Sequence, residues 1–286
     1  MFHYKTLKNI DIKILHEGFL NAFTDYEVKL DLPLYKFEKM LKRRGYVPEL
    51  SIGAFKDDAL VGFIFNGLRE WNGKPTVYDL GTGVIPEHRK KGITSNMFDS
   101  LLKLLKQKNI EQYLLEVIQS NTSALELYKK QGFKALRTFS CFQVDKSSYN
   151  PLSTYTIEHI NEIDATTWNQ LIEFWDITPS WQNSIDSINA LSHSFIYAVV
   201  RLDNAIVGYG IIDKKTGDIP QIGVNKKYRG LGIGQTILTD LINNTEANKI
   251  NIINVDDQCT TLKNFLCKLG FNLYVNQYEM ILNIYL

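Results

Sequence analysis

Short runs of alternating apolar and polar residues are interspersed with longer stretches whose apolar residues lie three or four positions apart. Alternation is typical of strands, and the longer spacing is typical of amphipathic helices. The first half is thus predicted to have strands at residues 4–7, 50–55, 60–66, 76–84, 113–118 and 135–144, and helices at 12–23, 34–44, 92–108 and 122–131. The second half is predicted to have strands at 195–201, 205–212, 219–224, 250–255 and 273–284, and helices at 232–243 and 260–269. This order predicts an α/β protein with a mixed sheet.

Three blocks of the first half return in the same order in the second half, which indicates an internal repeat. The central matches, each 140 residues apart, are Val84 and Val224, Arg89 and Arg229, and Gly92 and Gly232. Upstream, Val61-Gly62 returns as Val207-Gly208, and downstream, Gly132-Phe133 returns as Gly270-Phe271. One glycine-rich loop that recurred by chance would not keep three blocks in register. We therefore predict two homologous domains.

The boundary between the two copies is expected at residues 145–151. This stretch is polar, contains turn-forming residues and ends in Pro151, as linkers often do. The predicted domains are residues 1–145 and 152–286.

Composition excludes several classes of protein. The chain has 286 residues, of which 44% are apolar and 22% charged, and a net charge of +1, so a dedicated binder of nucleic acid or of an anionic membrane is not expected. Three cysteines without a CxxC pair and five scattered histidines argue against a disulfide framework or a metal site. No apolar run approaches the roughly 18 residues that cross a bilayer. We expect a cytoplasmic protein that holds no metal.

Both copies place a glycine-containing loop between a strand and a helix. The first copy has Arg89-Lys-Lys-Gly-Ile-Thr94 and the second has Arg229-Gly-Leu-Gly-Ile-Gly234. The first turn of a helix offers N–H groups and a positive dipole end, and glycine lets a phosphate come close to them. Neither a GxGxxG fingerprint nor a Gly-Lys-Ser/Thr loop is present. A glycine-tolerant turn with a solvated basic rim is the plainer interpretation, but the recurrence of the loop in the same context favours a site for a di- or polyphosphate.

The pattern Arg-x-x-Gly-x-Gly/Ala between a strand and a helix resembles the acetyl-CoA pyrophosphate motif of the GNAT acetyltransferases. Residues 121–133 match the second motif of that family, Asn-x-x-Ala-x-x-Leu-Tyr-x-x-x-Gly-Phe, at every named position. Thr94 departs from the usual Gly or Ala, so binding there is expected to be weakened or unchanged. The resemblance covers nearly the whole chain. It implies two tandem GNAT domains, each a mixed, mostly antiparallel sheet flanked by helices with a splayed central strand, and acetyl-CoA as co-substrate.

The resemblance also implies which residues contact the cofactor. These positions are Val84, Arg89, Lys90, Lys91, Gly92, Ile93, Thr94, Asn121, Ala124, Tyr128, Val224, Arg229, Gly230, Gly232 and Gly234.

Amine acetylation requires a polarised thioester, a base for the amine and an acid for the departing thiolate. In the family, a backbone N–H on the splayed strand polarises the thioester, which implies Val84 in the first copy and Val224 in the second. The motif tyrosine, here Tyr128, usually protonates the thiolate. The second copy has Leu266 at that position and Cys259 where the first has Asn121. Because leucine cannot donate a proton, catalysis is assigned to the first copy.

Glu116 is the first choice for the base. It stands 12 residues before Tyr128, a pattern similar to the branch that acetylates the N-terminal amine of a ribosomal protein. A strand carboxylate paired with a surface lysine is the alternative interpretation, and Asp79 and Glu70 are weaker candidates. In the second copy, Asp218 lies six residues before Val224, where the histone-modifying branch has a catalytic Glu, so activity there stays open.

The resulting expectation is an N-acetyltransferase that acts on a primary amine, either a small molecule or the N-terminus or a lysine of a protein. The acceptor cannot be read from the sequence. A monomer whose two domains form a pseudo-dimer is predicted. Two alternatives remain: a non-catalytic acyl-CoA sensor or structural tandem, and catalysis in the second domain.

Overall fold

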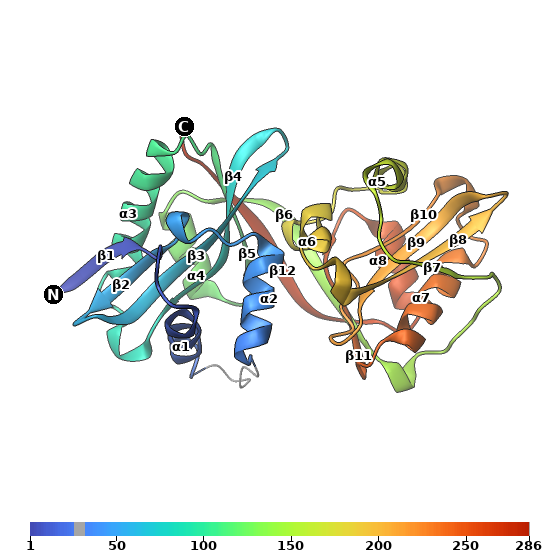
Figure 1. Cartoon of the computed structure of the whole chain (residues 1–286), viewed down its shortest axis with the longest axis horizontal. Coiled ribbons are helices and arrows are strands. Elements are labelled where there is room, and N and C mark those ends of the chain that lie inside the picture. The colour runs from blue at the N-terminus through green and yellow to red at the C-terminus, as the bar shows by residue number, and fades with distance from the viewer. Residues whose placement is uncertain (26–31, 286) are drawn as a thin grey trace. The chain divides into compact units, whose positions relative to one another are not determined.

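The computed structural model describes residues 1–25 and 32–285 (Figure 1). It contains two compact units, of which the first is Met1–Leu136 with Tyr278–Leu286 and the second is Arg137–Gln277. β6 (Lys134–Asp145) and β12 (Asn272–Asn283) each cross a boundary between the units. Most of β6, the last strand of the first repeat, therefore belongs to the second unit, and part of β12, the last strand of the second repeat, belongs to the first unit. The linker-based division at residues 145 and 152 instead leaves each strand in the domain of its own repeat.

The first unit is a sheet flanked by helices. Its strands are β1 (Phe2–Thr6), β2 (Ile52–Lys56), β3 (Ala59–Trp71), β4 (Lys74–Val84) and β5 (Gln112–Ile118), followed in the sheet order by β12. Its helices are α1 (Ile12–Ala22), α2 (Leu34–Arg44), α3 (Ile93–Gln107) and α4 (Thr122–Lys130). Pairing is antiparallel from β1 to β4 and parallel between β4 and β5.

The second unit repeats this plan. An antiparallel sheet has the order β10 (Gln221–Val224), β9 (Ala205–Asp213), β8 (Phe195–Leu202) and β7 (Glu158–Ile160), and β11 (Lys249–Asp256) pairs with β6. The helices are α5 (Ala165–Ile172), α6 (Ile185–Asn189), α7 (Ile233–Asn244) and α8 (Thr260–Lys268). The predicted α/β class with mixed sheets is confirmed. The sequence analysis missed β7, α5 and α6, whose apolar spacing is short and irregular.

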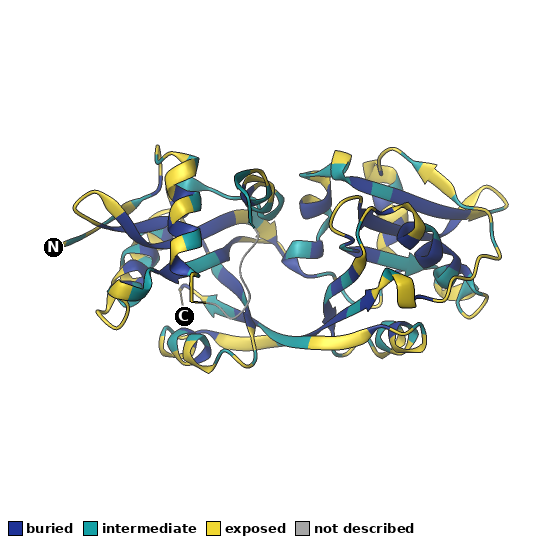
Figure 2. Cartoon of the chain, turned by 90° about the horizontal axis from the view of Figure 1, so that it is seen from below, coloured by how far each residue is buried: buried dark blue, intermediate teal, exposed yellow. Residues whose placement is uncertain are grey.

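Helix patterning explains the core of each unit. Met97, Phe98, Leu101 and Leu105 lie on one face of α3 and pack with residues of the sheet in the first core. α7 does the same in the second core, where its buried residues include Ile237 and Leu241. In Figure 2 the strands are largely buried, and the helices carry exposed residues on their outer faces.

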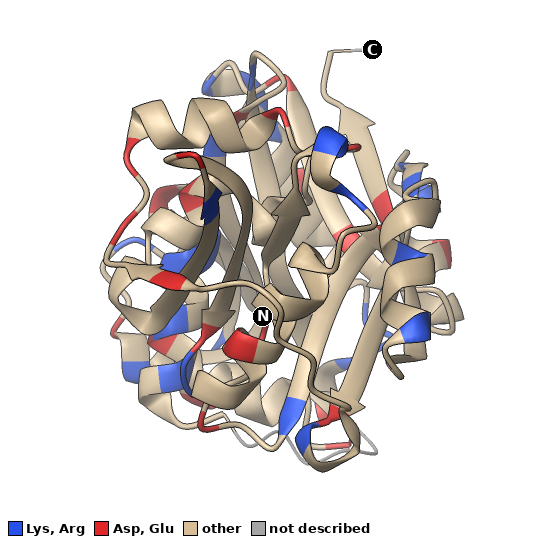
Figure 3. Ribbon diagram, turned by 90° about the vertical axis from the view of Figure 1, so that its right-hand side faces the viewer, with Lys and Arg blue, Asp and Glu red and all other residues tan. Residues whose placement is uncertain are grey.

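The two cores include residues of β12 and β6, which we call the exchanged strands because each belongs in part to the unit of the other repeat. Met280 and Ile284, from the end of the chain, belong to the core of the first unit. Phe142 and Val144, from β6, belong to the core of the second unit. In the ribbon diagram of Figure 3, Lys and Arg are interspersed with Asp and Glu along the chain.

Candidate active site and cofactor loops

In each unit, two parallel strands separate part-way along their length. The ladder between β4 and β5 covers Thr76–Tyr78 and ends at the pair Tyr78 and Leu114. In the second unit, the corresponding strands are joined by a single bridge between Asp218 and Asn251. Beyond these points one edge of β4 and of β10 is open to a ligand, which is the predicted splay.

Hydrogen-bond alternation decides which N–H groups face the open edge. Ile85 N donates to Val61 O at 3.0 Å, so in the antiparallel ladder the N–H of Val84 and of Thr82 point away from β3. Asn225 N donates to Val207 O at 2.9 Å in the second unit, and the N–H of Val224 and Ile222 point away from β9 likewise. The N–H groups of Val84 and Val224 therefore face the open edge. Sequence reasoning missed Thr82 and Ile222, although the two-residue period of a strand could have identified them.

The loops after these strands have the geometry of a phosphate cradle. Gly92 and Gly232 adopt the left-handed conformation, with φ of 74° and 89°, directly before α3 and α7. A β-carbon at Gly92 or Gly230 would meet no atom within 4 Å, so the loop surface is open at both. The first-turn N–H groups, including those of Thr94 and Gly234, lack an acceptor within the helix by helix geometry. The Ile93 side chain is buried in the core, so only its backbone can serve a ligand.

The motif arginines bind protein rather than extending into the loop. Arg89 Nε donates to Val84 O at 3.0 Å, and its Nη2 donates to Ala22 O at 2.7 Å. The guanidinium also pairs with Asp25, and this hydrogen bond is the largest cause that lowers the pKa of Asp25. The side chain therefore joins the end of β4 to the end of α1. Lys90 and Lys91 are exposed, and Lys91 Nζ donates to Glu87 O at 2.8 Å.

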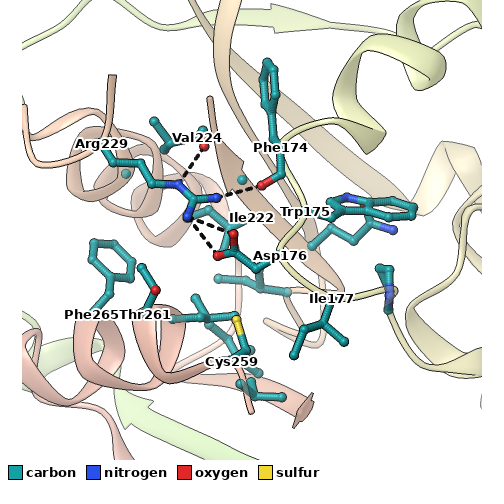
Figure 4. Close-up of a pocket in the computed structure, with 18 of the residues that line it drawn as sticks. Phe174, Trp175, Asp176, Ile177, Ile222, Val224, Arg229, Cys259, Thr261 and Phe265 are labelled. Atoms are coloured by element: carbon teal, nitrogen blue, oxygen red, sulfur yellow. Dashed lines mark hydrogen bonds and ion pairs between the residues drawn. The ribbon is translucent and has the colours of Figure 1, made fainter. Parts of the chain in front are cut away.

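The second unit repeats this clamp. Arg229 Nε donates to Val224 O at 3.1 Å, its Nη2 donates to Phe174 O at 2.8 Å, and its Nη1 lies 2.8 Å from Asp176 Oδ2 (Figure 4). The same three kinds of contact in both units indicate a built feature of the loop.

Asn121 and Ala124, both predicted cofactor contacts, meet each other at the start of α4. Asn121 Oδ1 caps the helix by accepting from Ala124 N at 3.2 Å. Cys259 holds the same position before α8 and makes no capping bond with its side chain.

Tyr128 and Asp79 meet where β4 and β5 separate in the first unit. Tyr128 is buried, and its hydroxyl lies 3.3 Å from Asp79 Oδ2. Burial raises the pKa of Asp79 to about 6, although hydrogen bonds from Thr82, Gly81 and Tyr128 oppose the shift. Glu116 is half-buried on β5. Its neighbours Leu115 and Val117 share the core with Tyr128, so Glu116 points to the other face of the strand. Glu70 is exposed near the far end of β3.

The second unit has neutral residues at the matching positions. By the repeat offsets, Ile219 stands for Asp79, Asn254 for Glu116 and Leu266 for Tyr128. Asn254 is held by hydrogen bonds from Gln277 Nε2 at 3.0 Å and to Ser180 Oγ at 3.1 Å. Among the described residues, Asp218 is not part of the cavity lining.

A cavity of about 710 Å³ lies against the loop of the second unit (Figure 4). Its lining combines the loop after α5, the open edge of β10 and the first turns of α7 and α8. Trp175 lines it and donates to Tyr209 Oη at 2.7 Å, and Tyr209 donates in turn to Gln221 Oε1 at 2.8 Å. Trp168 and Trp181 are instead buried in the protein interior.

Comparison with known proteins identifies the fold. Residues 13–133 match the acetyltransferase (GNAT) family model, and residues 162–280 match an acetyltransferase (GNAT) domain model. The chain belongs to the GNAT family. It is 30% identical over 123 residues to an N-alpha-acetyltransferase of Saccharolobus solfataricus, a match that covers 40% of this chain and 71% of the relative. It is thus a tandem GNAT acetyltransferase.

Two solved structures share the tandem GNAT plan over nearly the whole chain. A tandem GNAT protein from the clavulanic acid biosynthesis pathway matches with a TM-score of 0.74 and 14% identity, covering 99% of both chains. A GCN5-related N-acetyltransferase from Sphaerobacter thermophilus matches with a TM-score of 0.73 and 15% identity, covering 99% of this chain and 96% of its own. At such identity these matches show the fold alone.

Within residues 1–25 and 32–285, no helix is both long and apolar enough to cross a membrane. Nor do these residues bring three His, Cys, Asp or Glu side chains together in a group that could hold a metal ion.

Proposed function

We propose that this GNAT acetyltransferase transfers the acetyl group of acetyl-CoA to a primary amine, and that the first unit performs the chemistry. One observation carries the assignment of the unit: Tyr128 lies beside the open edge of β4, whereas Leu266 holds that position in the second unit. The named relative supports a protein N-terminus as one acceptor class, since it is an N-alpha-acetyltransferase.

The proposed roles belong to groups that lie where β4 and β5 separate. The N–H groups of Val84 and Thr82 polarise the thioester carbonyl and stabilise the tetrahedral oxyanion. Glu116, on the face of β5 opposite to Tyr128, takes the proton of the attacking amine. Tyr128 then protonates the departing thiolate, so that the products are the amide and CoA. The loop around Gly92 and the first turn of α3 hold the diphosphate.

The second unit is proposed to bind acyl-CoA without turning it over. The cavity of about 710 Å³ and the Arg229–Gly234 loop support this role. The neutral Ile219, Asn254 and Leu266 leave the thioester without the proton-transfer groups of the first unit. We further propose that the chain is monomeric, with the second repeat in place of a partner subunit.

Glutamate substitutions in the two loops test the assignment. Gly92→Glu and Gly230→Glu place a carboxylate beside each diphosphate site, and a repulsion of 1.4 kcal/mol already weakens binding about tenfold. Gly92→Ala and Gly230→Ala are the matched controls, because they share the strain of positive φ without the charge. Calorimetry with acetyl-CoA counts the sites, and release of CoA in the presence of a panel of amines measures turnover.

We expect Gly92→Glu to abolish turnover and to leave one acetyl-CoA site, and Gly230→Glu to keep turnover. Tyr128→Phe should lower kcat by about 100-fold, the ordinary contribution of a general acid. Turnover that survives Gly92→Glu and is lost in Gly230→Glu would move catalysis to the second unit. An absence of turnover with every amine would leave the acyl-CoA sensor as the better explanation.

A further inference from the structure

Asp79 lies at the point where β4 and β5 separate in the first unit. It follows Tyr78, the last residue of β4 that pairs with β5, and it is only 8% exposed. A β-bulge at Leu80 turns the strand here, because Asn66 opposes Asp79 and Phe65 opposes Gly81. The carboxylate thus lies where the two strands part and where the thioester is proposed to bind.

The carboxylate of Asp79 accepts three hydrogen bonds. Gly81 N lies 2.8 Å from Oδ1, Thr82 Oγ1 lies 2.7 Å from Oδ2, and Tyr128 Oη lies 3.3 Å from Oδ2. Asp79 therefore contacts the proposed acid directly.

Other charged and titratable groups face Asp79 from α2 and β5. Arg44 of α2 attracts the ionised carboxylate and so lowers its pKa, and Arg44 Nη1 donates to Leu80 O at 3.0 Å. Tyr113 of β5 also interacts electrostatically with Asp79, and its hydroxyl donates to Asn66 Oδ1 at 2.8 Å. Burial is the largest influence on the pKa of Asp79 and raises it, against the attraction of Arg44.

We infer that Asp79 and Tyr128 form a two-membered acid, in which the carboxyl proton of Asp79 replaces the proton that Tyr128 gives to the departing thiolate. This inference rests on the proposed function of the first unit. Asp79 acts through Tyr128 and is a positioning and proton-supplying residue, distinct from the amine base Glu116 on the opposite face of β5.

The step balances in atoms and charge. The C–S bond of the tetrahedral intermediate breaks, and its electron pair goes to sulfur. For this step Asp79 is protonated, so the hydrogen bond between the two side chains is reversed: the carboxyl O–H donates to the Tyr128 oxygen and the Tyr128 hydroxyl points to sulfur. Sulfur takes the Tyr128 hydroxyl proton, and the Tyr128 oxygen takes the Asp79 proton. The products are the amide, CoA thiol, neutral Tyr128 and ionised Asp79, which regains a proton from solvent before the next cycle.

Repulsion between like charges explains why the second proton matters. If Asp79 were ionised during the step, Tyr128 would become a phenolate 3.3 Å from a carboxylate inside the protein. A protonated Asp79 removes this repulsion. Burial raises its pKa to about 6, so the proton is present in mildly acidic solution.

The pH dependence of kcat at saturating amine tests the inference. In the unaltered protein, kcat should fall as pH rises above about 6, by about 50-fold between pH 6 and 8 for the loss of one proton. Asp79→Asn carries no ionisable group, so this falling limb should disappear. Thr82→Val removes a hydrogen bond that favours the ionised form, so the limb should move to higher pH. Thermal unfolding of each variant reports whether it is folded.

Several outcomes would overturn the inference. A kcat that rises between pH 6 and 8 in the unaltered protein would by itself overturn the inference. Loss of activity at every pH in folded Asp79→Asn, with Glu116→Gln active, would make Asp79 the amine base instead. A falling limb that persists in Asp79→Asn would assign it to another group. In each case acetyl transfer itself continues in the unaltered protein, so the proposed function would stand.

Discussion

Substitution of Met280 tests whether the end of the chain completes the first unit. Met280 is fully buried and belongs to the same core as Met97, Phe98 and Tyr113, although it follows them by more than 160 residues in the sequence. Met→Ala in a buried core costs about 2–5 kcal/mol, from lost burial and the cavity left behind. Against a typical domain stability of about 5–15 kcal/mol, this is a large fraction.

Hydrogen–deuterium exchange, measured on peptides, shows which elements lose stability in Met280→Ala. A cost of 2 kcal/mol accelerates exchange through unfolding by about 30-fold. We expect this acceleration in peptides of α3 and β5, with much less change in peptides of α7.

Phe142→Ala is the matched control. Phe142 is 2% exposed and lies in the core of the second unit, although the sequence repeat assigns it to the first. Its removal costs about 3–5 kcal/mol and should affect α7 rather than α3. Acceleration in α7 after Met280→Ala, with α3 unchanged, would refute the assignment of the exchanged strands.

The remaining predictions concern Arg229 and Asp79. Arg229→Met removes the hydrogen bonds to Val224 O and Phe174 O and the ion pair with Asp176. We expect calorimetry to show weaker binding of acyl-CoA to the second unit, and we expect a stability cost of about 1–3 kcal/mol. An unchanged affinity would contradict a role of these Arg229 contacts in shaping the cavity. The pKa of Asp79 is about 6 in the folded protein, against an ordinary value of 3.8. As pH rises, the unfolded chain therefore releases this proton before the folded chain does. Asp79 thus destabilises the fold increasingly between about pH 4 and 6, and by about 3 kcal/mol above that range. Denaturant titrations should therefore find Asp79→Asn more stable than the unaltered protein at pH 7.5 and not at pH 4, and a larger gain at pH 4 would contradict the shift.

The sequence predicted most of the fold because its strongest signals are local. Helix α3 follows from apolar residues at helical spacing and from Gly92, which turns the chain before it. The exchange of β6 and β12 could not be predicted, since both strands come from the same position of the repeat and carry similar apolar patterns. By its apolar pattern, either strand could pair in either sheet, so tertiary packing decides which unit each strand joins.

The candidate site was predictable in part for the same reason. Val84 follows from the motif spacing, but the contact between Asp79 and Tyr128 joins residues 49 positions apart and depends on a bulge. The partners of the motif arginines were also hidden. Asp25 and Asp176 follow helices at different offsets in the two copies, so the repeat does not align them.

The exchanged strands have a consequence for synthesis on the ribosome. The core of the first unit needs Met280 and Ile284, which are translated more than 140 residues after Leu136. At about 5–20 residues per second, the nascent first unit waits on the order of 10 s for its last strand. During that time the edge of β5 that receives β12 is open to other strands, so a chaperone that shields nascent β-edges would protect this protein specifically at its N-terminal half.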